Sequence, residues 1–234
     1  MIVNNFKQIA SLLSFTTKDS FYHLQILKRK KDCAEFDRGR NNNARCIKTY
    51  YIKSIEDFQK HEQEIIQLCE IFTARAYINL NEKSMERAAY ELNCQLADRL
   101  RFKQFDYTYR LFDTIIGGGY LEDEEDGKGP ATELELGSKI NIGQKRWIID
   151  VDEPEISPIM CAFIDYHCLP QVVTTENGSA VNYIKSKIIA SIPTKSGWHL
   201  ITTPFNLQQF HAEYPDIDIQ KNNPTVCYFN HKEE

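Results

Sequence analysis

Two segments in the second half of the chain carry residue types and spacings that could do chemistry. In the first, residues 146–153, a run of apolar residues gives way to Asp150 and Asp152. Alternation along a strand directs these two carboxylates to one face, while Ile149 and Val151 turn into the core. Carboxylates this close repel each other unless a cation lies between them. Such hard oxygen ligands suit Mg²⁺ or Mn²⁺ held together with the phosphates of a substrate.

The second segment, residues 192–202, places Lys195, Ser196 and His199 around a tight turn that contains Gly197. An ammonium, a hydroxyl and an imidazole together suit an anion, because each can donate a hydrogen bond to it. Taken alone, an acidic pair at a strand end is more often a turn or a helix cap, and a single histidine is more often packed. The combination of the two segments favours metal-dependent chemistry on a nucleotide.

The composition is that of an ordinary globular protein, with 234 residues, 42% hydrophobic and 26% charged. This length allows one large domain or two small modules. No apolar run approaches the length of a membrane span, and the N-terminal residues lack the features of a signal peptide. We therefore expect a cytoplasmic protein with no membrane partner. The net charge of −5 argues against a protein that clamps nucleic-acid backbone over its whole surface.

Charge and cysteine are unevenly distributed along the chain. Residues 28–31 form a basic run, and residues 122–126 form an acidic run inside a glycine-rich stretch at 117–137, which is typical of a loop or junction. Each run also fits an ordinary solvated surface. The seven cysteines are odd in number and scattered without a C-x-x-C pair, which is typical of reduced core residues.

Hydrophobic periodicity predicts an N-terminal αβ module over residues 1–116. Residues 21–27, 46–52 and 75–80 have strand character. Ser54 and Ser84 each precede an amphipathic helix. On the inward face of the second helix we expect Met85, Ala89, Leu92, Leu96 and Leu100.

After a loop or junction at 117–145, the pattern predicts a second module over residues 146–234. Its expected elements are, in order, the acidic strand, a helix over 156–168, a hairpin over 187–203, a short helix over 207–211, and strands around Ile217 and Val226. The fold class is thus α/β, of the α+β type, with two intimate modules.

A third carboxylate is expected near the end of the chain. Asp216 and Asp218 alternate to the same side of a strand. Pro215 makes Asp216 part of a turn, whereas Asp218 is flanked by isoleucines that would pack inward. The sequence therefore favours Asp218.

The order of these motifs resembles the archaeo-eukaryotic primase (primase-polymerase) superfamily, as a stand-alone catalytic domain. The motifs are Asp150-Val151-Asp152, then Ser196-Gly197-Trp198-His199, then Ile217-Asp218-Ile219. Residues 217–225 are also similar to the third motif in polymerase domains of bacterial end-joining ligases. The resemblance spans about residues 146–229. It departs from the family in placing the serine three residues before the histidine instead of two, and in showing no zinc-binding stem or helicase domain.

The resemblance implies an RRM-like sheet that carries the active site of a template-dependent nucleotidyltransferase. Two Mg²⁺ or Mn²⁺ ions would be held by Asp150, Asp152 and Asp218. The triphosphate would be held by Lys195, Ser196, Gly197 and His199. Which of Thr194, Lys195 and Ser196 makes the main phosphate contact is left open.

The resemblance also implies partners. In this family the N-terminal module helps to form the nucleic-acid groove, and the candidates here are Lys48, Arg75 and residues 28–31. Expected partners are nucleoside triphosphates, single-stranded or primer-template nucleic acid, and a separate helicase or other replication protein. The setting could be replication, repair or a mobile element.

Alternatives stay open on the residues alone. A metal-dependent, nuclease-like phosphoryl-transfer enzyme could use the same carboxylates, and an inactive nucleic-acid-binding relative could keep the fold. Cys161, His167 and Cys168 could be assembled into a zinc site, although their spacing is not that of zinc ligands. Trp198 alternates away from His199, which favours a core position over a base-stacking one.

Overall fold

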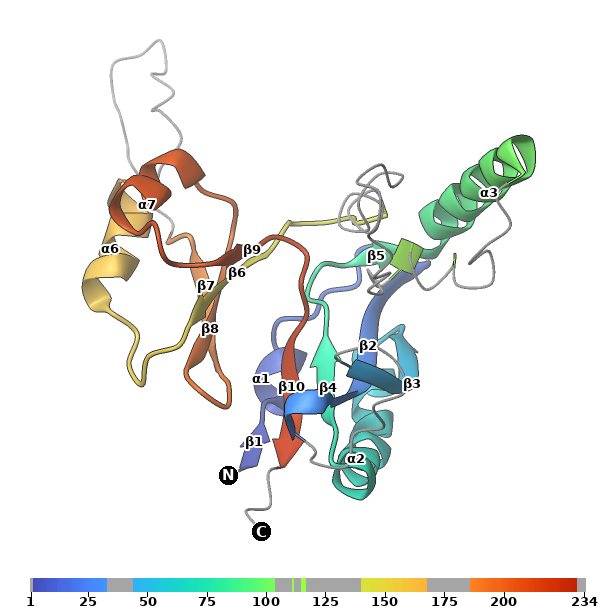
Figure 1. The fold of residues 1–234 in the computed structure, drawn as a ribbon, viewed down its shortest axis with the longest axis horizontal. Helices are drawn as coiled ribbons and strands as arrows, with labels where there is room; N and C mark the ends of the chain where they lie inside the picture. Colours follow the sequence, from blue (N-terminus) through green and yellow to red (C-terminus); the bar gives the residue numbers. More distant parts are fainter. Residues whose placement is uncertain are drawn as a thin grey trace. The chain divides into compact units, whose positions relative to one another are not determined.

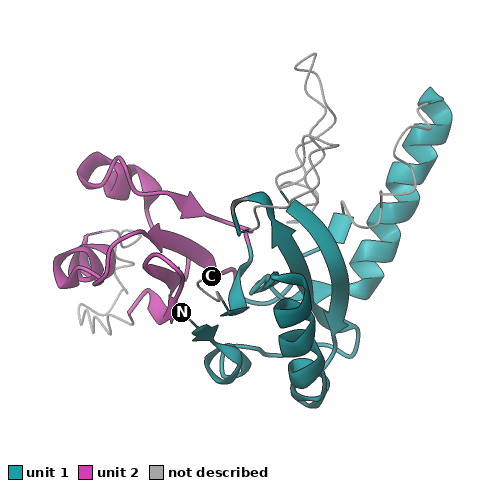
Figure 2. Ribbon diagram, turned by 60° about the horizontal axis from the view of Figure 1, so that its bottom comes forward, with its two compact units in different colours: residues 1–144, 224–234 teal, residues 145–223 magenta. Residues whose placement is uncertain are grey.

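The computed structural model describes residues 2–32, 44–103, 111, 115, 116, 140–167 and 186–230. The chain is a mixed α+β protein with antiparallel sheets. It divides into two compact units, coloured separately in Figure 2: the first is Met1–Gln144 with Pro224–Glu234, and the second is Lys145–Asn223. The predicted second module, 146–234, therefore extends too far, because the chain returns to the first unit at Pro224. The acidic run at 122–126 lies outside the described residues.

The first unit contains a six-stranded antiparallel sheet (Figure 1). Its strand order is β1-β10-β4-β2-β3, and β5 also pairs with β2. The strands are β1 (Ile2–Asn4), β2 (Ser20–Arg29), β3 (Ala44–Ile52), β4 (Arg75–Ile78), β5 (Lys83–Ser84) and β10 (Thr225–Asn230). The strands predicted at 21–27, 46–52 and 75–80 correspond to β2, β3 and β4 and are confirmed.

The last strand, β10, corrects the sequence analysis, which assigned the strand around Val226 to the second module. β10 lies between β1 and β4, with Val3 opposite Phe229 and Val226 opposite Tyr77. Residues 225–229 are all buried, as expected for a strand with partners on both sides. Burial of this apolar strand in the first sheet explains why the chain leaves the second unit before its end.

The helix α2 (Ile55–Phe72) packs on β2, β3, β4 and β10. It begins as predicted, because the hydroxyl of Ser54 accepts a hydrogen bond from the backbone N–H of Asp57 at 3.0 Å. Its buried residues are Phe58, Ile65 and Cys69. The short helix α1 (Phe6–Ala10) and the single 3₁₀ turn η1 (Lys30–Asp32) complete this part of the unit.

The helix α3 (Met85–Phe102) begins as predicted, because the hydroxyl of Ser84 accepts a hydrogen bond from the backbone N–H of Arg87 at 3.1 Å. Its buried residues are Ala88 and Glu91.

The predicted inward face of α3 is confirmed only in part. Met85 and Leu92 are partly buried and pack against a core cluster of the first unit. Ala89 is exposed, and Leu96 and Leu100 are 38% and 58% exposed. Periodicity therefore does not identify the buried residues along the whole helix, because burial depends on what lies next to it.

The second unit contains a four-stranded antiparallel sheet of order β7-β8-β6-β9. In chain order its elements are β6 (Trp147–Val151), α6 (Pro158–Tyr166), β7 (Ile188–Pro193), β8 (Trp198–Thr202), α7 (Leu207–Glu213) and β9 (Ile219–Gln220). These confirm the acidic strand, the hairpin and both helices. The hairpin turns at residues 194–197, as predicted.

The core of the second unit decides which way its acidic strand faces. Ile149 and Val151 of β6 pack with Leu200 of β8 against α6 and α7, whose buried residues include Met160 and Phe210. Because side chains alternate along a strand, Asp150 lies on the opposite face of the sheet. In the described part of the chain, no helix has the length and apolar character needed to cross a membrane.

Candidate active site

Asp150 lies at the centre of a row of residues that crosses three strands. On one side its register partner is His199 of β8. On the other side its backbone N–H donates to the carbonyl oxygen of Asp218 at 3.2 Å, which continues the β6–β9 pairing of Ile149 with Ile219. Residues directly opposite each other in antiparallel strands share a face of the sheet. The three sequence motifs therefore converge on one face of the second unit.

The side chains of Asp150 and His199 approach each other across the strands. His199 Nε2 lies 3.5 Å from Asp150 Oδ1, and the two side chains are 12% and 33% exposed. The neighbour of His199 on its other flank is Ile192, which is fully buried. Burial lowers the pKa of His199 below its ordinary value, against the opposing effect of the negative charges of Asp150 and Asp152. The imidazole is thus neutral near pH 7 and keeps one N–H donor.

Asp218 ends this row, and Asp152 lies outside it, just after β6. Asp152 follows β6 directly and is exposed. Asp218 is also exposed, and its Oδ2 accepts a hydrogen bond from Gln220 Nε2 at 3.0 Å. Asp216, the alternative third carboxylate, lies in the turn that Pro215 begins, as the sequence analysis expected.

The donor set has the chemistry of a hard-cation site, because all three of its carboxylates supply oxygen ligands. Among the described residues, no group of three or more His, Cys, Asp or Glu side chains is gathered closely enough to hold a metal ion. The backbone register thus lines up Asp150 and Asp218, with Asp152 two residues along β6, while the side chains are not drawn together.

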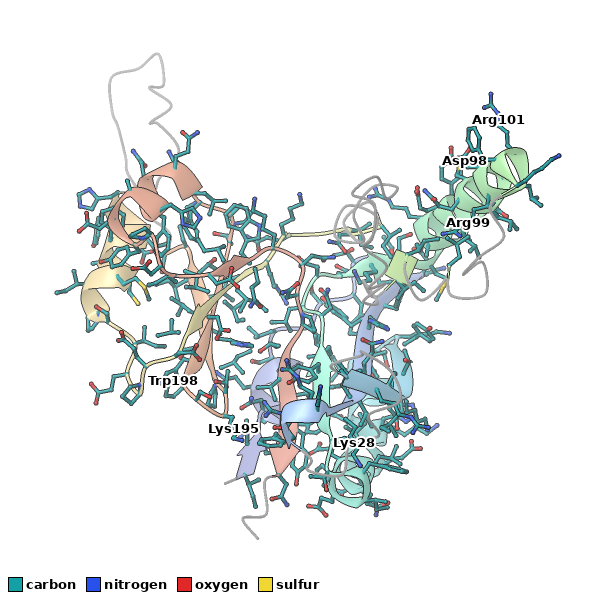
Figure 3. The ribbon with its side chains drawn as sticks, viewed as in Figure 1. Lys28, Asp98, Arg99, Arg101, Lys195 and Trp198 are labelled. Carbon is teal, nitrogen blue, oxygen red and sulfur yellow. The ribbon has the colours of Figure 1, made fainter. Side chains whose placement is uncertain are left out.

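Thr194 closes the hairpin turn between β7 and β8. Its backbone N–H donates to the carbonyl oxygen of Gly197 at 2.9 Å. Its hydroxyl oxygen accepts from the backbone N–H groups of Ser196 and Gly197 at 3.4 Å and 3.1 Å. Thr194 therefore has a structural task in the turn. Lys195 and Ser196 are the exposed residues of the turn, and Lys195 is labelled in Figure 3.

Gly197 has a structural reason to be glycine that the sequence analysis did not identify. A Cβ atom at this position would overlap the carbonyl oxygen of Val151 and lie 2.9 Å from the carbonyl oxygen of Glu153. The hairpin turn therefore lies directly against the end of the acidic strand. The close approach that the structure shows at Gly197 is to the carbonyl oxygens of Val151 and Glu153.

Trp198 connects the hairpin to the same acidic segment. Its ring packs in part against the core of the second unit, as predicted. Its indole N–H also donates to the carbonyl oxygen of Pro154 at 2.9 Å, an interaction that the sequence analysis missed. Alternation along the strand gives no signal of this hydrogen bond, because Pro154 lies 44 positions away in the sequence.

The structure corrects the prediction that Arg75 contacts nucleic acid. Arg75 is 6% exposed, and its guanidinium forms a bidentate pair with Asp32, with Nε 2.6 Å from Oδ2. The same guanidinium lies 4.2 Å from the ring centroid of Phe229. These contacts hold η1 against β4 and β10 and leave Arg75 inaccessible to a polyanion.

Lys48 is exposed, but its ammonium already interacts with other residues of the first unit. It forms an ion pair with Glu64 of α2, and its ammonium lies 4.7 Å from the centroid of the Tyr50 ring. A contact with nucleic acid would have to replace this pair. In the basic run, Lys28 and Arg29 are half-buried on β2, and Arg29 donates to the hydroxyl of Tyr77 at 3.1 Å.

The zinc alternative gains no support from the residues that the structure describes. Cys161 lies on α6, and His167 closes that helix with its ring stacked on Phe163 at 5.1 Å between centroids. Cys168 lies outside the described residues. Burial, followed by the charge of Asp165, raises the pKa of the Cys161 thiol, which disfavours the thiolate that zinc requires.

Comparisons of the chain with protein-family models, with curated proteins and with solved structures find no match.

Proposed function

We propose that this chain is the catalytic domain of a primase-polymerase, a template-dependent nucleotidyltransferase. The observation that carries the proposal is the register of the second sheet, which places Asp150 between His199 and Asp218. These residues come from segments separated by about 50 and 70 positions in the sequence. The pairing of β6 with β8 and β9 places the three motifs side by side on one face, as a shared site requires.

The topology of the second unit supports the same proposal. Its element order β6-α6-β7-β8-α7-β9, with strand order β7-β8-β6-β9, is that of the ferredoxin-like βαββαβ arrangement. This order of elements supports the RRM-like sheet that the motif order leads us to expect. The central strand β6 carries Asp150, where neighbours on both sides can contribute side chains.

In the proposed reaction, a 3′-hydroxyl oxygen forms a bond to the α-phosphorus of a nucleoside triphosphate, and pyrophosphate leaves. Bound Mg²⁺ or Mn²⁺ ions would activate the attacking oxygen and neutralise charge on the leaving group. Asp150, Asp152 and Asp218 would hold them, since Asp218 lies beside Asp150 in the β6–β9 pairing and Asp152 follows β6 directly. Their negative charges would otherwise repel an incoming triphosphate.

The hairpin would bind the triphosphate beside those carboxylates. His199 is adjacent to Asp150 and half-enclosed by apolar neighbours, so its neutral imidazole can donate one oriented hydrogen bond to a phosphate oxygen. Lys195, exposed in the turn, would add positive charge, and Ser196 a hydroxyl donor. The partners of this activity are nucleoside triphosphates and a single-stranded or primed template.

The direct test is incorporation of labelled nucleotides on a single-stranded template with Mn²⁺ or Mg²⁺, with and without a primer. We expect synthesis by the wild-type protein and none by Asp150→Ala or Asp152→Ala, because loss of one ligand disables metal binding more than it disturbs packing. Asp98→Ala, an exposed carboxylate on α3 (Figure 3), is the matched control and should remain active. Near-normal synthesis by either active-site variant contradicts the proposal.

Nucleotide binding separates a polymerase from a nuclease built on similar carboxylates, which needs no triphosphate site. We expect His199→Ala to weaken nucleoside triphosphate affinity in a calorimetric titration while the protein stays folded. His211→Ala, which changes an exposed histidine on α7, should bind as the wild type does. Unchanged affinity in His199→Ala, or digestion of the template without synthesis, would favour the nuclease.

A further inference from the structure

The segment that follows β6 must be restrained by contacts with another part of the protein if Asp152 is to keep one position. β6 ends at Val151, and residues 152–155 have no regular structure and are exposed. A carboxylate on such a segment would lose conformational entropy on binding a cation unless the backbone were already fixed. A site with preorganised ligands therefore requires contacts that restrain this segment.

Trp198 of the hairpin contacts the chain on both sides of Asp152. The backbone of Trp198 is the register partner of Val151, which immediately precedes Asp152. The side chain of the same Trp198 donates its indole N–H to the carbonyl oxygen of Pro154 at 2.9 Å. The dipeptide Asp152-Glu153 is thus bracketed by the main chain and the side chain of a single tryptophan.

Three features restrain the segment between Val151 and Pro154. The Trp198 ring packs in part against the core of the second unit, which limits the directions in which its N–H can point. Gly197 removes the only side-chain atom that would separate the hairpin from the carbonyl oxygens of Val151 and Glu153. The ring of Pro154 further restricts the backbone at the far end of the bracket.

We propose that Trp198 is a positioning residue that fixes the backbone of the Asp152 segment through its indole N–H and so preorganises Asp152 as a ligand for a divalent cation. The inference rests on the proposed function, in which Asp152 is such a ligand. Trp198 itself touches neither cation nor substrate in this role. It acts by restraining the backbone after Asp152, through its hydrogen bond to the carbonyl oxygen of Pro154.

Trp198→Phe tests the role, because it keeps an aromatic ring on the core and removes the N–H. Trp147→Phe is the matched control, since Trp147 lies on the same strand pair at the far end of β6 and packs on Phe205. Two quantities are measured on each full-length variant without nucleic acid: hydrogen exchange of peptides covering residues 150–157, and Mn²⁺ affinity by calorimetry.

In Trp198→Phe we expect faster exchange over residues 150–157 and Mn²⁺ affinity lower by about 10–100-fold, with neither change in Trp147→Phe. Unchanged hydrogen exchange would show that the indole N–H does not restrain the segment. Faster exchange with unchanged Mn²⁺ affinity would contradict the positioning role. Failure of the proposed function is seen separately in the wild-type protein, as the absence of Mn²⁺ binding or as binding that Asp152→Ala leaves intact. Either result would also remove the ligand that Trp198 is proposed to position.

Discussion

The two units treat charged side chains in opposite ways. In the first unit, Arg75 and Asp32 are 6% and 9% exposed and satisfy each other in a bidentate pair. Lys83, which is fully buried, donates to the side-chain carbonyl oxygen of Asn141 at 2.9 Å. In the second unit, Asp218 and Asp152 are exposed, the first beside Asp150 on β9's side of the sheet and the second just after β6.

The burial of a charged side chain and its partners indicate whether that side chain is structural or could bind a ligand. A buried charge must find its partner within the protein, because an uncompensated one costs several kcal/mol. Such a pair is part of the fold and is not available to a ligand. Carboxylates lined up toward an exposed edge repel one another, and a cation is the partner that would relieve this repulsion. Burial with a partner thus marks structure, and an aligned exposed row marks a candidate site.

The largest expected effect is a loss of catalysis when a carboxylate of the exposed row is changed. Asp218 continues the β6–β9 register next to Asp150, whereas Asp216 lies in the preceding turn. We expect Asp218→Asn to lower nucleotide incorporation by about 10–100-fold or more. Loss of a group that only supports a metal ligand already costs that much. Asp216→Asn should keep most of the activity. The reverse result would place the register wrong by one dipeptide.

The next effect is on stability and would test whether the first unit's buried pair is structural. Asp32→Ala leaves the Arg75 guanidinium buried without its anion, and we expect it to lower the free energy of unfolding by about 3–5 kcal/mol. Glu64→Ala breaks the exposed pair with Lys48, and should cost less than about 1 kcal/mol. Urea unfolding of both variants measures this, and equal losses would refute the distinction between the pairs.

The last effect is a dependence of stability on pH that comes from the first unit. Burial lowers the pKa of Lys83 from its ordinary 10.5 to about 7. Burial, followed by the charge of Lys83, lowers the pKa of His23 from 6.5 to about 3. Between each pair of values the unfolded chain binds a proton that the folded protein does not. Stability therefore falls as pH falls, from 10.5 to 7 for Lys83 and from 6.5 to 3 for His23.

Each group contributes a slope of up to about 1.4 kcal/mol per pH unit within its window. Urea unfolding across pH 4 to 6.5 should therefore show a shallower dependence in His23→Phe than in the wild type. Lys83→Met should flatten the dependence above pH 7 instead. Parallel curves for the wild type and His23→Phe below pH 6.5 would show that His23 is not buried in its neutral form.

Much of the candidate site could be predicted from the sequence, because its parts are local. Alternation along β6 separates Asp150 from Ile149 and Val151, and the turn at residues 194–197 follows from its threonine and glycine. The hydrophobic pattern could not show that Trp198 reaches Pro154 or that Gly197 lies against Val151. These contacts join segments that are more than 40 positions apart, and their geometry depends on how β6 and β8 pair.

The sequence by itself determined where elements begin and how their residues alternate. Ser54 and Ser84 cap α2 and α3 through hydrogen bonds to residues three positions ahead, which involve no distant part of the chain. Only the tertiary structure decided that β10 lies between β1 and β4, that Arg75 is enclosed with Asp32, and that Asp150 is flanked by His199 and Asp218. The physical reason is that strand pairing and register are set by burial of both faces of a sheet at once, and a strand's own residues do not specify its neighbours.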